Sequence, residues 1–522
     1  MAIQKRLIIS AALSGLLLTA AFPNVGWAFL AWIGMVPILV ALQRSELGSG
    51  FRLGYLAGLV HFLSLTYWIA HAIATYGGLP WLLAIPILFL LTAYLALFPA
   101  LFLWILKLSS PGPTVSMVLA PSLWVGLEYL RSVFLTGFPW ELLGYSQYRF
   151  LSLIQSADIF GVYGISFLLV AANTALALSL CALAKRPWFG RPVPLHKAGL
   201  ALGAVVLVMM GFLLYGRGRI DTIDQQIARA PHVTVGIIQG NVPQDIKWDK
   251  AFAKQTLSRY LGLSQALSPR PDLIVWPETA VPFYFPYDAE FSLELVRGIK
   301  TIGTDFIIGS PSVTVLEPDK TLQYHNSVFL ISGEGEIVDR YDKSHLVPFG
   351  EYVPLRRWLP FLGTIVAQVG DFAAGQPGHV LPWRGHKVGP LICFEMIFPH
   401  MSRAQVRNGA KVLVNVTNDA WYGRSSAPHQ HFSMAVLRAV ENRRALVRSA
   451  NTGISGFIDP VGRIGKTSDL FVEATLSQPV ALLSGLTPYV RWGDFFAWAC
   501  LVAVSYTHLR AHETTASISY AV

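Results

Sequence analysis

The chain has 522 residues, of which 53% are hydrophobic and only 13% are charged. Because soluble domains usually carry about a quarter charged residues, this composition excludes an ordinary soluble globular protein and indicates a membrane protein. The net charge of +10 does not indicate nucleic-acid binding, since the basic residues are scattered and mostly flank apolar runs rather than forming a stripe.

The first 217 residues consist mainly of apolar runs, and a helix needs about 20 such residues to cross a bilayer. Seven runs of suitable length lie near residues 7–22, 26–43, 53–75, 80–106, 115–131, 162–184 and 198–216. The first run follows Lys5 and Arg6 as in a signal peptide, but a second span follows at once and no small-residue cleavage site stands out. We therefore predict an N-terminal transmembrane region of about seven helices over residues 1–217, beginning with a retained anchor.

The distribution of Lys and Arg predicts the orientation of these helices, because short cytoplasmic loops carry the excess of positive charge. If the N-terminus lies inside, the inside segments hold Lys5, Arg6, Arg44, Arg52, Lys107, Lys185, Arg186, Arg191 and Lys197. The short outside turns near 23–25 and 77–79 hold neither residue type. Seven crossings then place everything after about residue 217 outside the cytoplasm, in the periplasm of a Gram-negative cell.

Four ionisable residues fall within the predicted spans, where a charge is costly to bury: His61, His71, Glu128 and Arg131. Glu128 and Arg131 stand three residues apart on one helical face, so they can pair with each other. A structural pair of this kind is favoured over a proton path, which weakens the interpretation of the chain as a transporter without excluding it.

From about residue 231 to 480 the pattern changes to short β-rich runs that end at turn residues. The predicted strands cover 233–239, 272–276, 306–309, 327–332, 388–393, 412–416 and 456–458. Helical stretches lie between several of them, around 249–267, 289–301, 400–409 and 428–447. Strands that alternate with helices predict an α/β domain with buried sheets. No glycine-rich phosphate loop is present, so a nucleotide site is not supported.

Reactive side chains follow three of the predicted strands. Glu278 comes after an apolar strand that Pro277 ends, and Lys343 lies in a loop that closes with Glu351. Cys393 ends a third strand and is the one cysteine of the polar half. Together these residues fit a nucleophile, a base and an electrostatic partner. Taken singly, each has an ordinary structural explanation, such as a buried strand cysteine or a solvated loop charge.

Three motifs, in this order and after a multi-span segment, carry a family resemblance. They are Trp-Pro-Glu ending at Glu278, Lys-Ser-His-Leu-Val-Pro-Phe-Gly-Glu-Tyr-Val-Pro starting at Lys343, and Leu-Ile-Cys-Phe-Glu ending at Glu395. With them the chain resembles, over residues 1–505, the apolipoprotein N-acyltransferases, membrane-anchored members of the nitrilase or carbon-nitrogen hydrolase superfamily. The resemblance implies an α-helical transmembrane bundle plus a nitrilase-like αββα sandwich over residues 231–480.

The resemblance also implies catalytic residues. The Glu-Lys-Cys triad of the family falls on Glu278, Lys343 and Cys393, and the family's two further glutamates match Glu351 and Glu395. These two are expected to orient the lysine and the nucleophile.

Other positions are expected to support the reaction or bind substrate. The family often has tyrosine after the nucleophile, where this chain has Phe394; the hydroxyl is lost, but the backbone N–H remains available to an oxyanion. An early block of the family matches Gln239, Asn241 and Trp248, which are expected to line the acyl pocket. For Trp248, ordinary packing is an equally good explanation.

The implied activity is N-acyl transfer in two steps through a thioester. The donor is a phospholipid, typically phosphatidylethanolamine, and the acceptor is the α-amino group of a diacylglyceryl-modified cysteine at a lipoprotein N-terminus. The expected location is the bacterial inner membrane, with the catalytic domain in the periplasm. No cofactor is expected. His429 and His431 flank Gln430, but two histidines without a third ligand are weak evidence for a metal, and none is predicted.

Two loops rich in apolar and aromatic residues, 281–287 and 352–372, are candidates for lids that dip into lipid, with ordinary loop packing as the alternative. The residues concerned are Phe283, Tyr284, Phe285, Trp358, Leu359 and Phe361.

Two other functions remain open at this point. A membrane-tethered amidase or nitrilase shares the fold and the triad and passes the acyl group to water. A non-enzymatic scaffold or transporter is the other alternative, and the intact triad argues against it.

The C-terminal end is unusual. An apolar stretch at 494–505 is too short to cross a bilayer, so we interpret it as a truncated last helix. Residues 506–522 resemble translated adapter sequence, and we expect them to be a non-native tail.

Overall fold

The computed structural model describes residues 2–244, 247, 250–316, 320–352 and 372–506. The chain divides into two compact units. One comprises Met1–Arg219 with Asp494–Val522, and the other comprises Ile220–Gly493. The first unit is helical, and the second holds every β-strand found in the described residues.

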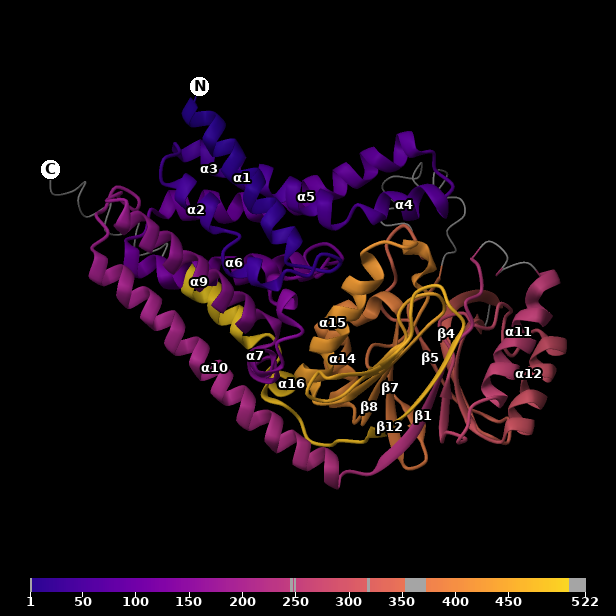
Figure 1. The fold of residues 1–522 in the computed structure, drawn as a ribbon. Helices are drawn as coiled ribbons and strands as arrows, with labels where there is room; N and C mark the ends of the chain where they lie inside the picture. Colours follow the sequence, from indigo (N-terminus) through magenta and orange to yellow (C-terminus); the bar gives the residue numbers. More distant parts are fainter. Residues whose placement is uncertain (1, 245–246, 248–249, 317–319, 353–371, 507–522) are drawn as a thin grey trace. The chain divides into compact units, whose positions relative to one another are not determined.

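The helices of the first unit are rich in apolar residues and are joined mostly by short turns (Figure 1). Their bounds are α1 (Ala2–Ala20), α2 (Val36–Leu42), α3 (Leu47–Leu65), α4 (Trp68–Thr75), α5 (Trp81–Ser109), α6 (Pro113–Val133), α7 (Leu151–Ile154), α8 (Ala157–Phe160), α9 (Val162–Leu183) and α10 (Leu195–Arg229). The part of α10 from Ile220 onward belongs to the second unit.

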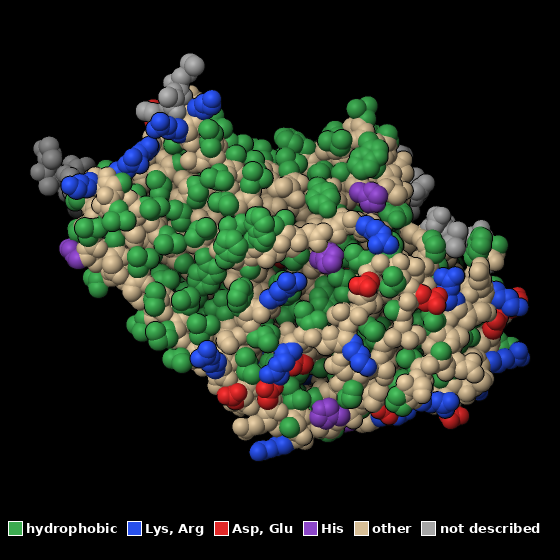
Figure 2. All heavy atoms as spheres, in the orientation of Figure 1, with side chains coloured by type: hydrophobic (Ala, Val, Ile, Leu, Met, Phe, Trp, Pro, Cys, Tyr) green, Lys and Arg blue, Asp and Glu red, His purple; other side chains and the backbone are tan. Residues whose placement is uncertain are grey.

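Among the described residues, α5, α9 and α10 are long and apolar enough to cross a membrane, and α3 with α4 makes a fourth span if this bent pair counts as one. Shorter apolar helices cover Ala28–Leu42, Leu151–Phe160 and Phe495–Tyr506. Hydrophobic side chains dominate the surface of this unit in Figure 2. Leu82 and Leu90 of α5, for example, are exposed. Such a surface suits lipid rather than water. The count of seven crossings stays a prediction.

The two charges of α6 are buried and bonded to neighbours within the helical unit. Glu128 Oε1 accepts hydrogen bonds from Trp124 Nε1 at 2.9 Å and from the Leu143 N–H at 2.7 Å. The Arg131 guanidinium donates to the Trp140 carbonyl at 3.2 Å and lies over the Phe62 ring. Each charge is therefore held by its own backbone and aromatic partners.

The second unit contains two six-stranded sheets. The first has the order β12-β1-β2-β3-β4-β5 and the second has the order β11-β10-β9-β8-β7-β6. The bounds are β1 (His232–Gln239), β2 (Leu273–Val275), β3 (Asp305–Leu316), β4 (Thr321–Ile331), β5 (Ile337–Asp342), β6 (Leu381–Trp383), β7 (His386–Ile392), β8 (Val412–Thr417), β9 (Ala445–Ala450), β10 (Gly456–Ile458), β11 (Ile464–Thr467) and β12 (Ala474–Ala481).

Each sheet has a parallel centre, β1-β2-β3 in one and β7-β8-β9 in the other, flanked by antiparallel strands. Successive side chains of a strand point to opposite faces, so a strand buried on both faces reads as a continuous apolar run. In β2, Val275 packs into the core between the sheets and Ile274 into the core on the outer face. This double burial explains why these strands are evident in the sequence.

Helices cover the outer faces of the two sheets (Figure 1). The helices α11 (Lys250–Gln265) and α12 (Ala289–Ile302) pack on one sheet, whereas α14 (Pro399–Arg407) and α15 (Ala427–Asn442) pack on the other. The unit is therefore an αββα sandwich, as predicted.

One predicted helix is too long. The stretch 428–447 was expected to be helical throughout, but α15 ends at Asn442 and Ala445 already belongs to β9. Arg443 adopts a left-handed conformation with φ +50°, which ends the helix. The remaining residues are apolar enough to continue a helical pattern, but in the fold they form a fully buried central strand.

Candidate active site

The predicted nucleophile, Cys393, lies on a sharp turn where β7 ends. Cys393 is the first residue of the short 3₁₀ helix η3 (Cys393–Ile397) and has φ +48°, which is unusual for a residue with a side chain. A left-handed residue costs roughly 1–2 kcal/mol, so the surrounding contacts must hold it. Cys393 therefore stands just after the last residue of β7, and it is only 6% exposed.

Glu395 ties this turn to the loop that carries the lysine. Its Oε2 accepts the Ile392 N–H at 2.7 Å, and its Oε1 accepts the Ser344 N–H at 2.7 Å and the Tyr341 hydroxyl at 2.8 Å. Burial raises the pKa of the Glu395 carboxyl. Its contacts fit the orienting role that the family resemblance implies.

The carboxylate of Glu278 lies just beyond β2 and is buried. Its Oε1 accepts the Asn326 side-chain amide at 2.8 Å, its Oε2 accepts the Asn418 N–H at 2.9 Å, and Lys343 Nζ lies 3.6 Å away. The carboxylate is thus fixed from both sheets, since Asn326 lies on β4 and Asn418 follows β8.

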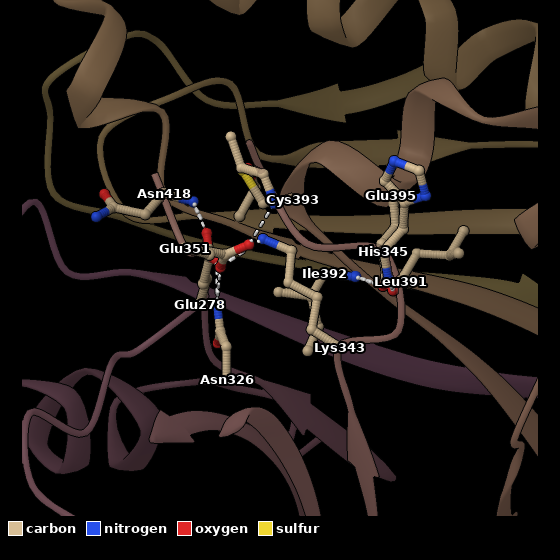
Figure 3. A network of polar contacts seen from close by, with 12 residues as sticks. Glu278, Asn326, Lys343, His345, Glu351, Leu391, Ile392, Cys393, Glu395 and Asn418 are labelled. Atoms are coloured by element: carbon tan, nitrogen blue, oxygen red, sulfur yellow. Dashed lines mark hydrogen bonds and ion pairs between the residues drawn. The ribbon is translucent and has the colours of Figure 1, made fainter. Parts of the chain in front are cut away.

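Lys343 follows β5 and projects between two carboxylates (Figure 3). Its Nζ donates to Glu351 at 2.9 Å, and Glu351 also accepts the Val347 N–H and the Asn326 amide. Burial alone would lower the pKa of Lys343, but the charges of Glu351 and Glu278 outweigh it and raise that pKa. The ammonium is therefore retained in a site where it is only 1% exposed.

The surroundings of Cys393 favour the thiol over the thiolate. Burial is the largest effect and raises its pKa, and the Glu278 carboxylate raises it further. Lys343 acts in the opposite direction but is outweighed. A thiol can attack only if a nearby base takes its proton.

Gln239 and Asn241 lie where β1 ends, and their contacts are internal. The Gln239 amide nitrogen donates to the carbonyls of Asp469 and Val472, and its oxygen accepts from two serine hydroxyls. The Asn241 N–H donates to the Asn451 carbonyl at 3.0 Å. Trp248 lies outside the described residues. A role of these three in binding the acyl chain stays a prediction.

The candidate lid at 281–287 is mainly core. Phe283 and Phe285 are 6% and 1% exposed and pack against Phe291 and Phe329, whereas Tyr284 is exposed. The lid interpretation was therefore wrong for the two phenylalanines, because the loop folds back onto the sheet. In the second candidate loop, residues 353–371 lie outside the described residues.

Several polar residues of the site carry no signal in the sequence. Asn326 bridges Glu278 and Glu351, Tyr341 bonds Glu395, and Lys247 donates to the Glu278 carbonyl at 3.1 Å. Lys247 and Tyr341 stand beside motif residues, next to Trp248 and two positions before Lys343, but their contacts with the two glutamates depend on the fold. In the part of the chain that the structure describes, no three His, Cys, Asp or Glu side chains are grouped to hold a metal ion.

Comparisons with known proteins cover both units. The model of the apolipoprotein N-acyltransferase N-terminal domain matches residues 14–175, and that of the carbon-nitrogen hydrolases matches residues 234–482. An apolipoprotein N-acyltransferase of Geobacter metallireducens is 44% identical over 507 residues, which is 97% of this chain and 95% of that protein. One of Methylococcus capsulatus is 35% identical over 487 residues, covering 92% and 91%.

A solved structure of a mutant amidase from Nesterenkonia sp. AN1, with a covalent acetamide adduct at its active-site cysteine, is also similar. It is 19% identical and has a TM-score of 0.38, covering 51% of this chain and 97% of that one.

The second unit is thus a carbon-nitrogen hydrolase domain, and in this chain it accompanies a helical unit suited to a membrane. The chain belongs to the apolipoprotein N-acyltransferase family. The predicted family, the acyltransferase class and the combination of membrane helices with a nitrilase-like sandwich are confirmed, and the chain is a membrane protein.

Proposed function

We propose that this chain transfers an acyl chain from a phospholipid, through a thioester on Cys393, to the N-terminal amino group of diacylglyceryl-cysteine in lipoproteins. The observation that carries the proposal is the gathering of Glu278, Lys343 and Cys393 in one buried site (Figure 3). Relatives named apolipoprotein N-acyltransferases match nearly the full length of the chain, which supports a lipoprotein acceptor.

The first half-reaction forms the thioester. Glu278 accepts the thiol proton as Cys393 Sγ attacks the ester carbonyl, and the carbonyl π electrons move onto the oxygen. The Lys343 ammonium and the Phe394 N–H stabilise this oxyanion, and one such donor is commonly worth about 3–4 kcal/mol. When the intermediate collapses, the C–O bond to the leaving alcohol breaks and Glu278 returns its proton to that alcohol. The acyl chain stays on Cys393.

The second half-reaction uses the same groups. The amine attacks the thioester carbonyl, Glu278 accepts the amine proton, and the C–S bond breaks. Glu278 then returns the proton to the leaving Cys393 thiolate, so the enzyme regains its starting state and the product is an amide. Lys343 keeps its charge in both half-reactions, so it stabilises each oxyanion without gaining or losing a proton.

The donor and the location follow from the family resemblance and from the sequence. Phosphatidylethanolamine is the proposed donor. The proposed location is the bacterial inner membrane, with the catalytic unit in the periplasm, because Lys and Arg gather in the segments expected to be cytoplasmic. The amidase and scaffold alternatives are not favoured, since the relatives that match both units are acyltransferases.

The test is acyl transfer from phosphatidylethanolamine to a diacylglyceryl-cysteine peptide, catalysed by the purified full chain in detergent. We expect a triacylated peptide with the wild type and none with Cys393→Ala. A matched control is Cys181→Ala, which removes a buried cysteine of α9 and leaves transfer unchanged. Release of free fatty acid with an unmodified peptide would instead identify a hydrolase. Full transfer by Cys393→Ala would refute the proposed nucleophile.

A further inference from the structure

A second buried polar network contacts the turn that carries the nucleophile. It is formed by Asn415 on β8, Asp419 in η4 (Asp419–Tyr422), His431 on α15 and Arg448 on β9. All four side chains are fully buried. None of them takes part in the mechanism above, although the network begins and ends on the residues around Cys393.

The network connects the Leu391 carbonyl with the Cys393 carbonyl. Asn415 donates to the Leu391 carbonyl at 3.0 Å and accepts from Arg448. Arg448 donates to Asp419 Oδ2 at 2.8 Å and to His431 Nδ1 at 3.0 Å. His431 Nε2 then lies 3.2 Å from the Cys393 carbonyl oxygen. The chain of contacts therefore holds carbonyls on both sides of the turn.

These contacts assign the tautomer of His431. A guanidinium has donors only, so Nδ1 accepts from Arg448 and the imidazole hydrogen resides on Nε2. Asp419 Oδ1, which lies 3.1 Å from Nδ1, accepts the Thr417 hydroxyl at 3.0 Å. Burial and the neighbouring Arg448 charge lower the pKa of His431, against the smaller effect of Asp419. A neutral imidazole that accepts from Arg448 at Nδ1 and donates from Nε2 to the Cys393 carbonyl fits these two contacts, while the Thr417 hydroxyl is the donor to Asp419 Oδ1.

The Cys393 carbonyl shares a planar peptide unit with the Phe394 N–H, and in a trans peptide the two groups point in opposite directions. A group that holds the carbonyl therefore also sets the direction of the N–H. The peptide between Leu391 and Ile392, two units earlier, is held at both edges, by Asn415 at the Leu391 carbonyl and by Glu395 at the Ile392 N–H. Two of the three peptides between Leu391 and Phe394 are thus fixed by buried side chains.

We propose that His431 is a positioning residue for acylation: by holding the Cys393 carbonyl it aims the Phe394 N–H at the oxyanion, while Arg448 and Asp419 hold its ring. This role rests on the thioester chemistry of the proposed function. It requires neither a metal nor a charge on His431. It also explains how a cysteine with φ +48° is retained at the end of β7.

The test separates oxyanion stabilisation from placement of the sulfur. Acylation of Cys393 by p-nitrophenyl butyrate, followed as a burst of p-nitrophenolate, passes through an oxyanion, whereas alkylation by iodoacetamide does not. The informative variants are His431→Met, which lacks an N–H donor, and His431→Gln, which is of similar size and keeps one. His429→Met changes a neighbouring histidine on the same helix and serves as the control.

We expect His431→Met to slow acylation by about 10²-fold, as for the loss of one oxyanion donor, with little change in KM for the ester. Alkylation of Cys393 should stay close to the wild-type rate, and His431→Gln should recover much of the acylation rate. Equal losses of acylation and alkylation, or an acylation rate unchanged in His431→Met, would overturn the role of His431. Wild-type acylation by the ester but not by phosphatidylethanolamine would reject the proposed donor and leave this role intact.

Discussion

The charges of α6 in the helical unit and the charges of the active site are buried in different surroundings. In the helical unit, Glu128 and Arg131 bond to backbone and aromatic groups, and the apolar side chains face outward. In the catalytic unit, the apolar side chains fill the sandwich, and buried charges such as Lys343 face other charges. Glu128 and Arg131 are thus bonded in a way that suits a structural role, whereas the charges gathered around Lys343 are those that the proposed chemistry uses.

The largest effect is expected at the centre of the catalytic unit. Lys343→Met removes the cation between Glu278 and Glu351 and leaves two buried carboxylates without it. We expect acylation to fall by at least about 10²-fold, and the free energy of unfolding to fall by about 3–5 kcal/mol. Burst kinetics measures the acylation rate and thermal denaturation measures the stability. Lys387→Met, at an exposed lysine of β7, is the control. An acylation rate close to that of the wild type would remove Lys343 from the mechanism.

A pH titration sharpens the same comparison without a mutation. Because the pKa of Cys393 is raised, the thiolate fraction below it grows about tenfold per pH unit, and so should the rate of alkylation by iodoacetamide. The pKa of Lys343 is raised above its ordinary value of 10.5, so its charge and the associated stability persist at least up to that pH. We expect the alkylation rate to rise steadily from pH 6 to 9. A plateau near pH 7 would indicate a thiolate paired with Lys343.

In the helical unit, a buried charge should matter for stability alone. Glu128→Gln keeps an oxygen for Trp124 and Leu143 but introduces an amide in place of a carboxylate. We expect a loss of about 1–3 kcal/mol in the free energy of unfolding, with the acyl-transfer rate of the folded protein unchanged. The exposed Glu46→Gln is the control. If transfer fell while stability stayed the same, Glu128 would belong to the chemistry and the comparison would fail.

The smallest effect is expected at an exposed ion pair of the catalytic unit. Arg463 bonds Asp224 at 2.6 Å and 2.7 Å, but both side chains are about 40% exposed. A double-mutant cycle with Arg463→Ala and Asp224→Ala should give no more than about 1 kcal/mol, and less at high salt. A coupling well above this value, insensitive to salt, would show that solvent exposure does not decide the strength of this pair.

Much of the catalytic fold can be predicted because strands that are buried on both faces have a strong signature. The runs at 233–239, 388–393 and 412–416 coincide closely with β1, β7 and β8. The reactive residues at strand ends can be found for a related reason, since Pro277 stops the strand before Glu278 and Cys393 directly follows β7. Such features are local, so a single segment displays them.

Features that depend on packing between segments were missed. Asn326 and Asn418 both contact Glu278, although they come from different sheets. His431 contacts Cys393 although it lies 38 positions later in the chain, on a helix. The start of β9 was predicted to be helical, because its residues are apolar and directly follow an amphipathic stretch. The burial of Phe283 likewise depends on Phe291, which belongs to the next helix.

The central claim is that Cys393 carries the acyl chain. The most direct measurement is intact-protein mass spectrometry of the full chain after incubation with phosphatidylethanolamine, for the wild type and Cys393→Ala. We expect an added acyl mass on the wild type alone, removed by hydroxylamine, and the same adduct on Cys181→Ala. An adduct of equal amount on Cys393→Ala, or one resistant to hydroxylamine, would contradict the thioester on Cys393.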